Sequence, residues 1–526
     1  MRIVPGPLRR LLRAVIAPIF AAALLAGCAL PPLANRAETR ALTTEQSRDT
    51  DLGRVLAPAL DAHPGLSGIH PLVDARAAFA VRVHAARSAQ RTLDVQYYIW
   101  RDDLTGTLLL EALHEAADRG VRVRLLLDDN GISGLDETLA ALDAHPNIEV
   151  RLFNPFVVRH PKSIGYVTDF RRLNRRMHNK SFTVDAQATI VGGRNVGDEY
   201  FGATDGVLFA DLDVLAVGPV AADVEHDFDR YWASESAYPV TSIVRAVDAA
   251  RLDELAHKAA SVARDPAAAA YMDALRGLPV VRQMLDGSLP FEWAATRIVS
   301  DDPGKILGAA PKEALIGHQL REIIGTPERE LDLISPYFVP TAAGTATFTE
   351  LAGQGVTVRV LTNAREATDV TAVHSGYARR RKALLEGGVH LYELRRSATP
   401  ADSSGKREER GATVGSSGSS LHAKTFAVDA ARVFVGSFNF DPRSANLNTE
   451  LGFVIASPVL AGRIESAFST TVPENAYEVR LSDTGELYWL ERRGTETVRH
   501  DTEPNTGWFG RFGVWFLSIL PIEWLL

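Results

Sequence analysis

The sequence predicts an α/β protein of two domains, each a mixed sheet flanked by helices. Length is the first observation, because 526 residues are too many for one ordinary domain, while 46% hydrophobic and 23% charged residues suit a folded globular protein. Second, strand-like apolar runs alternate with helix-like segments in both halves of the chain. Third, MHNKSFTVDAQATIVGGRN at 177–195 returns as LHAKTFAVDAARVFVGSFN at 421–439. The chain therefore repeats one architecture.

The first residues carry the pattern of an exported protein. Four arginines lie between positions 2 and 13, the apolar run AVIAPIFAAALLAG follows, and Cys28 comes directly after it. This predicts a secretory signal peptide over 1–27, too short to span a membrane stably. The letters LAGC resemble the lipobox of bacterial lipoproteins, which implies that Cys28 is lipidated and anchors the chain in the cell envelope, facing the periplasm. The alternative is an unmodified cysteine, and a single cysteine allows no intramolecular disulfide.

The charge balance disfavours one class of partner. Removal of residues 1–27 takes four of the 57 basic residues and no acid, so 53 basic residues face 65 acidic ones, a formal net charge of −12. Proteins that bind nucleic acids in general are basic. We therefore expect no nucleic-acid partner.

The segments that follow differ in composition. Residues 28–69 begin with a polar, proline-bearing stretch and are interpreted as a tether between the anchor and the folded body. The first domain is expected over 70–239, with LDVQYYIW and GVRVRLLLDDN as strands. Residues 240–290 are rich in alanine and leucine at helical spacing, so they predict a helical connector.

The second domain, expected over 291–470, repeats the series with LDLISPYFV and GVTVRVLTNA. The polar stretch SATPADSSGKREERGATVGSSGSS, just before the second phrase, predicts a mobile loop at the edge of a site. Residues 471–526 are expected to form a hairpin and an apolar tail, GWFGRFGVWFLSILPIEWLL. Arg511, Pro521 and Glu523 interrupt this tail, which favours an interfacial or core-docked position over a membrane span.

The first copy of the phrase sets His178 and Lys180 two residues apart. On a strand, this spacing places both side chains on one face. A hairpin centred between residues 186 and 187 would bring Asn195 opposite His178 and Gly193 opposite Lys180. Asp185 would then lie by the turn, about 17 Å from Lys180 at roughly 3.3 Å per residue. We interpret Asp185 as a turn residue.

The second copy follows the same geometry. A hairpin centred between residues 430 and 431 would pair Asn439 with His422 and Ser437 with Lys424. Asp429 is the corresponding turn residue. Each hairpin therefore gathers a histidine, a lysine and an asparagine at one end.

These three side chains suit phosphoryl transfer. Lysine offers a positive charge and asparagine a neutral donor, both of which bind phosphate oxygens. Histidine serves as a nucleophile or as a proton carrier near neutral pH. Two copies face to face would let one histidine attack phosphorus while the other protonates the departing alcohol, in a two-step, in-line displacement. The expected catalytic residues are His178, Lys180, Asn195, His422, Lys424 and Asn439, with Gly193 and Ser437 in substrate binding.

Each histidine also needs a partner that fixes its tautomer. Asp211 lies 33 residues after His178, and Glu450 lies 28 residues after His422, both at the start of a strand-like run. We predict that Asp211 and Glu450 hydrogen-bond to the histidines of their own halves. The alternative, that both phrases form ordinary core hairpins, is disfavoured because nine of the eighteen positions from His178 are identical in the second copy.

The spacing His-x-Lys-x4-Asp-x6-Gly-(Gly/Ser)-x-Asn, complete in both copies, resembles the signature of the phospholipase D superfamily. The stretches HPLVDARAAFAVRVHAARSAQRTLDVQYYIWRDDLTG, IEVRLFNPF and LPIEWLL resemble its bacterial cardiolipin synthase C branch. The resemblance covers the chain after the tether. It implies two phospholipase D-like α/β sandwich domains related by a pseudo-twofold axis, with one site between them and catalysis without metal or cofactor.

The resemblance also implies a reaction. His178 would be the nucleophile, and His422 the general acid and then the general base. A phosphatidyl group would pass from phosphatidylethanolamine or phosphatidylglycerol to phosphatidylglycerol at a membrane surface. A phospholipase D or phosphodiesterase with water as acceptor, or a nuclease, would use the same motifs, and a non-catalytic envelope lipoprotein would keep only the fold. The sequence identifies no protein partner.

Overall fold

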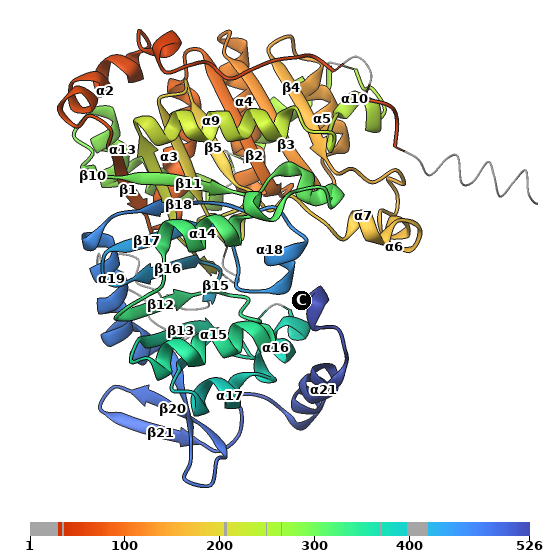
Figure 1. Cartoon of the computed structure of the whole chain (residues 1–526). Coiled ribbons are helices and arrows are strands. Elements are labelled where there is room, and N and C mark those ends of the chain that lie inside the picture. The colour runs from red at the N-terminus through yellow and green to blue at the C-terminus, as the bar shows by residue number, and fades with distance from the viewer. Residues whose placement is uncertain are drawn as a thin grey trace, which may run out of the picture.

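The computed structural model describes residues 30–33, 36–204, 208–248, 250–262, 264, 266–368, 370–396 and 419–526. The predicted signal peptide, Cys28 and most of the predicted polar loop lie outside the described residues. The described chain folds into two α/β halves stacked one above the other (Figure 1). This is the α/β class that the sequence predicted, with two large mixed sheets flanked by helices.

The sheet of the first half has nine strands. Strands β2 to β4 are parallel and joined by helices, whereas β5, β6 and β8 are antiparallel neighbours. The order across the sheet is β10 (Glu292–Ala294), β1 (Ser67–Leu72), β8 (Asp213–Val217), β6 (Ala188–Gly192), β5 (Ser181–Val184), β2 (Thr92–Ile99), β3 (Arg122–Gly131), β4 (Ile148–Phe153) and β9 (Ala237–Pro239).

The sheet of the second half repeats this order and adds a hairpin at one edge. Eight strands correspond in sheet order, from β1 and β11 at one side to β9 and β19 at the other, while β10 has no counterpart in the second sheet. The order is β11 (Thr296–Ser300), β18 (Leu451–Ile455), β17 (Arg432–Gly436), β16 (Lys424–Val428), β12 (Glu330–Ile334), β13 (Thr357–Asn363), β14 (His390–Leu394), β19 (Ala476–Leu481), β20 (Leu487–Arg493) and β21 (Glu496–His500). The predicted duplication is thus a duplication of topology.

Helices cover both faces of each sheet. In the first half, α3 and α4 pack on one face through Phe79 and Leu109, while α9 covers the other, where Arg124 lies over Phe228. The helices of this half are α3 (Ala75–Ser88), α4 (Leu104–Asp118), α5 (Asp136–Asp143), α6 (Ser163–Thr168), α7 (Phe170–Leu173), α8 (Asp198–Phe201) and α9 (Pro219–Trp232). Those of the second half are η2 (Pro303–Leu307), η3 (Lys312–Ala314), α14 (Ile316–Ile324), α15 (Thr341–Gly353), α16 (Thr371–Ala378), α17 (Arg381–Glu386), α18 (Pro442–Asn446), α19 (Pro458–Ser469) and α20 (Thr471–Asn475).

The segment expected over 240–290 to connect the halves is helical. It contains α10 (Val240–Ile243), α11 (Ala250–Val262), α12 (Pro266–Arg276) and α13 (Pro279–Leu285). The chain ends with α21 (Trp508–Ile519) and η4 (Glu523–Leu525). No helix in the described part of the chain is long and apolar enough to cross a membrane.

The tether expected over residues 28–69 differs from the structure. From residue 36 onward this segment packs on the first half and includes η1 (Glu45–Ser47) and α2 (Asp51–Ala62). The Arg36 side chain donates to the Ser234 carbonyl at 2.5 Å, and the Ala41 N–H donates to Asp229 at 3.0 Å. A polar composition predicts a segment exposed to solvent, whereas here the polar groups of the segment bond to the body of the protein.

The pairing register of the two repeated hairpins differs by one residue from the expected register. Val184 pairs with Ala188 and Val428 with Arg432, so each turn has three residues and is centred on Ala186 or Ala430. Asp185 and Ala186 take left-handed φ values of 50° and 51°, and the second turn does the same. Lys424 therefore lies opposite Gly436, not Ser437, since turn length sets the register of a hairpin.

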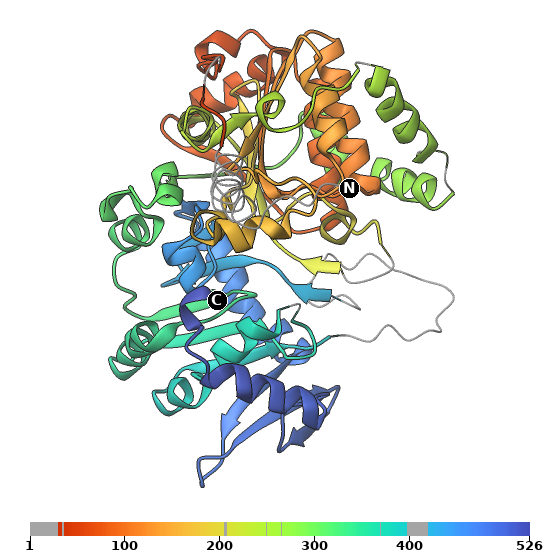
Figure 2. The ribbon, with the colours of Figure 1, turned by 90° about the vertical axis from the view of Figure 1, so that its right-hand side faces the viewer.

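The halves share a core as well as a site. Val191 and Val214 of the first sheet and Val435 and Phe453 of the second belong to one buried apolar cluster. In addition, β7 (Leu208–Ala210) pairs with β15 (Ser419–Leu421) in a small parallel sheet made from both halves. Figure 2 shows these two strands side by side, in yellow and blue.

Candidate active site

Each motif histidine is delivered by a short strand contact with the opposite half. The β7–β15 pair ends where the His422 N–H donates to the Ala210 carbonyl at 2.9 Å. The matching contact joins Met177 to Thr449, and there the His178 N–H donates to the Thr449 carbonyl at 2.9 Å. Each histidine thus lies beside a residue of the other half, His422 beside Ala210 and His178 beside Thr449.

These contacts exchange the predicted carboxylate partners, so the expected pairing within each half is wrong. His178 Nδ1 lies 2.8 Å from Glu450 Oε2, and His422 Nδ1 lies 2.5 Å from Asp211 Oδ2. All four residues are at least nine-tenths buried. The sequence pointed to these two histidines and two acids. Distance along the chain could not reveal that each acid bonds to the histidine of the opposite half.

The electrostatics leave both imidazoles neutral at pH 7. Burial lowers the pKa of His178 to about 4, an effect that Glu450 opposes and Lys180 reinforces. Burial, with Lys424, lowers the pKa of His422 to about 4 as well. Since each Nδ1 faces a carboxylate, the proton belongs on Nδ1, which leaves the lone pair of Nε2 as base or nucleophile. Nε2 of His422 also lies 3.2 Å from Lys424 Nζ.

The carboxylates keep their charge despite burial. Burial alone would raise the pKa of Glu450, but its interaction with His178, the charge of Lys180 and the hydrogen bond from Ser437 bring it below the usual range. The pKa of Asp211 is likewise lowered, because His422 outweighs the burial effect. Two charged acids therefore orient two neutral imidazoles.

The lysines supply the positive charge of the site. Lys180 Nζ donates to the His178 carbonyl at 2.5 Å, and Lys424 Nζ makes the same contact with its own histidine carbonyl. Burial and the charge of Lys424 together lower the pKa of Lys180 to about 7, although Glu450 opposes them. Each histidine also experiences the charge of the opposite lysine, so the two half-sites form one centre.

The two asparagines are not equivalent. Asn195 accepts from the Ile99 N–H at 3.2 Å and donates to the Tyr200 hydroxyl at 3.1 Å, so both ends of its amide are used. Asn439 is buried too, but its Oδ1 makes no hydrogen bond within the described residues. Only the second asparagine keeps an amide oxygen free of the protein.

Gly193 and Ser437, which are expected in substrate binding, both lie against the carboxylates of the site. The Ser437 hydroxyl donates to Glu450 Oε2 at 2.5 Å and accepts from the Leu451 N–H at 2.9 Å. A Cβ on Gly193 would lie 2.1 Å from Asp211 Oδ1. Gly193 thus limits the space around Asp211, and Ser437 limits the space around Glu450.

Asp185 and Asp429 lie in the hairpin turns, as the spacing indicated. The Asp185 carboxylate accepts from three successive backbone N–H groups, of residues 90 to 92. Asp429 accepts from the N–H groups of residues 328 to 330 in the same manner. Each aspartate fastens the hairpin to the start of the next strand, β2 or β12.

Tyr98 of the YYIW stretch lies at the site, although it is not among the residues expected there. Tyr97 and Trp100 are fully buried, but Tyr98 points to the other face, with its ring 5.0 Å from the His178 ring, edge to face. Tyr200 stands 5.2 Å from the His422 ring in the same way. The alternation of strand side chains was the signal that separates Tyr98 from Tyr97.

The arginines before His178 mostly bond within the protein. Arg176 is buried and donates to Asp128 at 2.6 Å, and Asp128 also accepts from the Met177 N–H at 2.8 Å. Arg172 bonds to Asp169 at 2.6 Å. Arg176 and Asp128 therefore hold the strand that presents His178.

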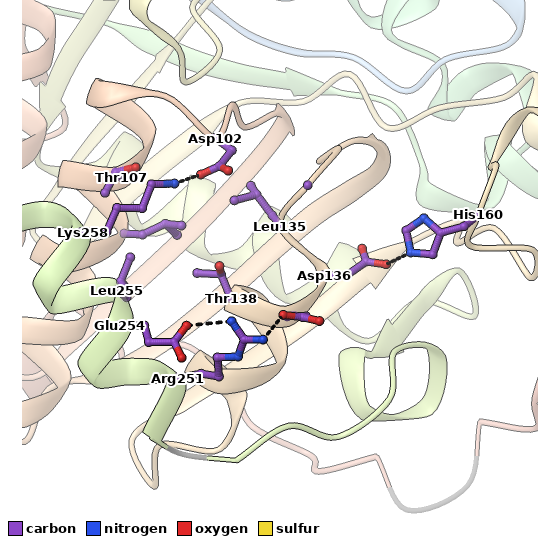
Figure 3. A pocket seen from close by; sticks show the side chains of 13 residues that line it. Asp102, Thr107, Leu135, Asp136, Thr138, His160, Arg251, Glu254, Leu255 and Lys258 are labelled. Carbon is purple, nitrogen blue, oxygen red and sulfur yellow. Dashed lines mark hydrogen bonds and ion pairs between the residues drawn. The ribbon is translucent and has the colours of Figure 1, made fainter. Parts of the chain in front are cut away.

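A separate cavity of about 500 Å³ lies between α11 and the first half, away from the paired histidines. Its acids and bases neutralise one another, as Figure 3 shows: Arg251 bridges Glu254 at 2.7 Å and Glu137 at 2.6 Å, and Lys258 pairs with Asp102. These exposed pairs tie the connector to the first domain rather than offering free charge to a ligand.

A duplicated α/β fold with two such half-sites defines a protein of the phospholipase D-like class. The family described as "Cardiolipin synthase, PLD-like domain" matches residues 83–232 and 320–472, and the chain belongs to it.

Relatives span most of the chain. Cardiolipin synthase C of Escherichia coli K12 is 49% identical over 475 residues, which cover 90% of this chain and 99% of that protein. Cardiolipin synthase A of Pseudomonas entomophila is 25% identical, over 87% of this chain and 80% of that protein. Among solved structures, phosphatidylserine synthase of Haemophilus influenzae superposes with a TM-score of 0.52 at 13% identity, over 81% of this chain and 92% of that one, and supports the fold alone.

Proposed function

We propose that the protein is a cardiolipin synthase, which moves a phosphatidyl group from phosphatidylethanolamine or phosphatidylglycerol to the free glycerol hydroxyl of a second phosphatidylglycerol. One observation carries the proposal: two neutral imidazoles, each oriented by a carboxylate from the opposite half, share one buried centre with two lysines. The similarity to Escherichia coli cardiolipin synthase C supports the choice of substrates.

The first step forms a bond from His178 Nε2 to the phosphorus and breaks the bond from phosphorus to the headgroup oxygen. The departing alkoxide takes a proton from His422 Nε2. Since His422 is neutral in the empty site, this proton must enter when the anionic diester binds and raises the pKa of the imidazole. The lysines hold the non-bridging oxygens.

In the second step His422 acts as a base instead of an acid, and His178 is the leaving group. His422 accepts the proton of the acceptor hydroxyl, the oxygen attacks phosphorus, and the bond to His178 breaks. One diester replaces another, so the reaction needs no nucleotide. Water must be kept from the phosphohistidine, or phosphatidate forms instead.

The test uses the purified protein, with chelator, in vesicles of phosphatidylglycerol with or without phosphatidylethanolamine. Mass spectrometry identifies the lipid products and the released headgroup. Cardiolipin is expected, with ethanolamine or glycerol naming the donor. Phosphatidate alone would make the chain a phospholipase D, and no product from an intact fold would leave it a non-catalytic lipoprotein.

We also propose that Cys28 is the lipidated N-terminus of an envelope lipoprotein facing the periplasm. The sequence LAGC after an apolar run supports this. Radiolabelled palmitate should enter the native protein but not Cys28→Ala. Equal labelling of both would contradict the assignment.

A further inference from the structure

The C-terminal helix α21 displays its large apolar side chains to solvent. The buried Val514 and the half-buried Leu517 lie on its inward side. The outward side carries a row at helical spacing, each 48–82% exposed: Trp508, Phe509, Phe512, Trp515, Phe516 and Ile519. A surface helix normally has the opposite arrangement, and a patch of this kind marks an interaction surface.

The helix is held firmly in this orientation. Just before it, the buried Glu503 accepts from Arg381 at 2.6 Å and contacts His374 Nε2 at 2.8 Å. Just after it, Glu523 accepts from both ends of the Arg380 guanidinium, at 2.7 and 2.9 Å. Ion pairs thus fix the helix at both ends and hold its apolar side chains in the exposed orientation.

The surface has the charge of a lipid-binding element. Between Glu503 and Glu523 the sequence contains no acid and one base, Arg511. The two flanking acids are turned inward against Arg380, Arg381 and His374. A face of tryptophan and phenylalanine without acids is complementary to the headgroup region of an anionic bilayer.

The end of the chain connects this surface to the active site. Leu526 packs on Val339 and Val373, and its carbonyl accepts from the Arg443 N–H at 3.0 Å. The Arg443 guanidinium reaches the first half at Asn174, 2.7 Å away. Arg443 follows Asn439 by four residues, and Asn174 precedes His178 by four. The tail therefore ends at the active-site seam, the region where the two halves meet beside the two motifs.

We propose that the exposed face of α21 inserts into the surface of an anionic phospholipid bilayer and positions the active-site seam beside the membrane. The inference rests on the proposed function, because it supplies water-insoluble diesters to that site. A second copy of the chain and a soluble partner protein are the other occupants that the test must distinguish.

The direct test places a fluorescent label at two positions of the full chain. Cys28→Ala removes the only cysteine, after which Phe512→Cys reports on α21 and Val55→Cys, 62% exposed on α2 of the first half, is the matched control. Phosphatidylglycerol vesicles carrying a lipid-attached quencher should quench the label at 512 at least twofold more than the label at 55. Equal quenching would overturn the proposal, as would a change at 512 that depends on protein concentration without vesicles.

The functional arm separates docking from chemistry. The double variant Phe512→Ser, Trp515→Ser should lose at least tenfold of its transfer activity on vesicles and keep activity within twofold on short-chain, monomerically dissolved lipids. Equal loss on both substrates would overturn the docking role. If the unaltered protein makes no cardiolipin from either substrate, the proposed function fails, whereas the label at 512 still answers the docking question.

Discussion

The two half-sites have the same backbone but different carboxylate environments. The imidazole of His178 faces Glu450, whose carboxylate also accepts from Ser437, whereas the imidazole of His422 faces Asp211, a shorter acid fitted against Gly193. The serine hydroxyl of one pair is thus replaced in the other by close contact between the glycine and Asp211. The two imidazoles therefore have unequal acid partners, and the residue after the first motif glycine, Gly193 or Ser437, is one of the positions at which the two copies differ.

The largest effect should come from the histidines themselves. His178→Ala and His422→Ala should each reduce turnover by about 10³-fold or more, because each removes an essential nucleophile or proton carrier. A donor with a good leaving group needs no acid, so only His422→Ala should accumulate a phosphatidyl-histidine, detected by intact-protein mass spectrometry. Accumulation in His178→Ala instead would reverse the roles.

Removal of an acid should reproduce the loss of the histidine in the opposite half. Glu450→Gln and Asp211→Asn should each lower kcat by about 10²- to 10⁴-fold, because the amide favours the wrong tautomer. Proton NMR should show the downfield Nδ1–H signal of His178 lost in Glu450→Gln and kept in Asp211→Asn. The reverse pattern would mean that each acid serves its own half.

The motif position after the first glycine should respond unequally in the two halves. Gly193→Ala should lower kcat by about 10²-fold, since the new Cβ would displace Asp211 from His422. Ser437→Gly should cost about three- to tenfold, because Glu450 loses one hydrogen bond but keeps His178. The acid limb of the pH–rate profile should shift in the serine variant, a change that general loosening of the fold would not cause. Similar losses in both variants would remove the asymmetry.

Anion binding should depend on pH through Lys180. Its pKa of about 7 in the empty site rises when an anion binds, so binding at pH 8 should take up a proton, and affinity should fall by up to tenfold per unit above pH 7. Calorimetry with tungstate in buffers of different ionisation enthalpy measures this uptake. Lys424→Met removes a neighbouring positive charge and should shift the dependence to higher pH, whereas Lys180→Met should leave only the proton that His422 takes up.

The smallest effect on activity is expected at the turn aspartates. Asp185 is fully buried and Asp429 is half-buried, although each accepts from three backbone N–H groups. Asp185→Ala should lower the free energy of unfolding by about 2–3 kcal/mol and Asp429→Ala by about 1 kcal/mol, since only the first leaves buried donors unsatisfied. Urea denaturation measures both. An equal cost would mean that burial does not separate them.

The repeat, the alternation of strands and helices, and the six motif side chains were accessible from the sequence because they depend on local spacing. The exchange of Asp211 and Glu450 was not, because it depends on how two separate sheets meet. The hairpin register failed by one residue, since left-handed φ at Asp185 and Ala186, an alanine, is set by the packing around the turn. Tyr98 was missed although its side-chain direction follows from the period of the strand.

The strand contacts that carry each histidine to the other half also bear on how such a protein could arise. If one half existed alone, it could complete its imidazole–acid pairs only by associating with an identical copy, and every substitution would then appear at both imidazoles at once. Joining the halves in one chain removes that restriction. Glu450 with Ser437 and Asp211 with Gly193 could then diverge independently, which a symmetric pair of subunits does not allow.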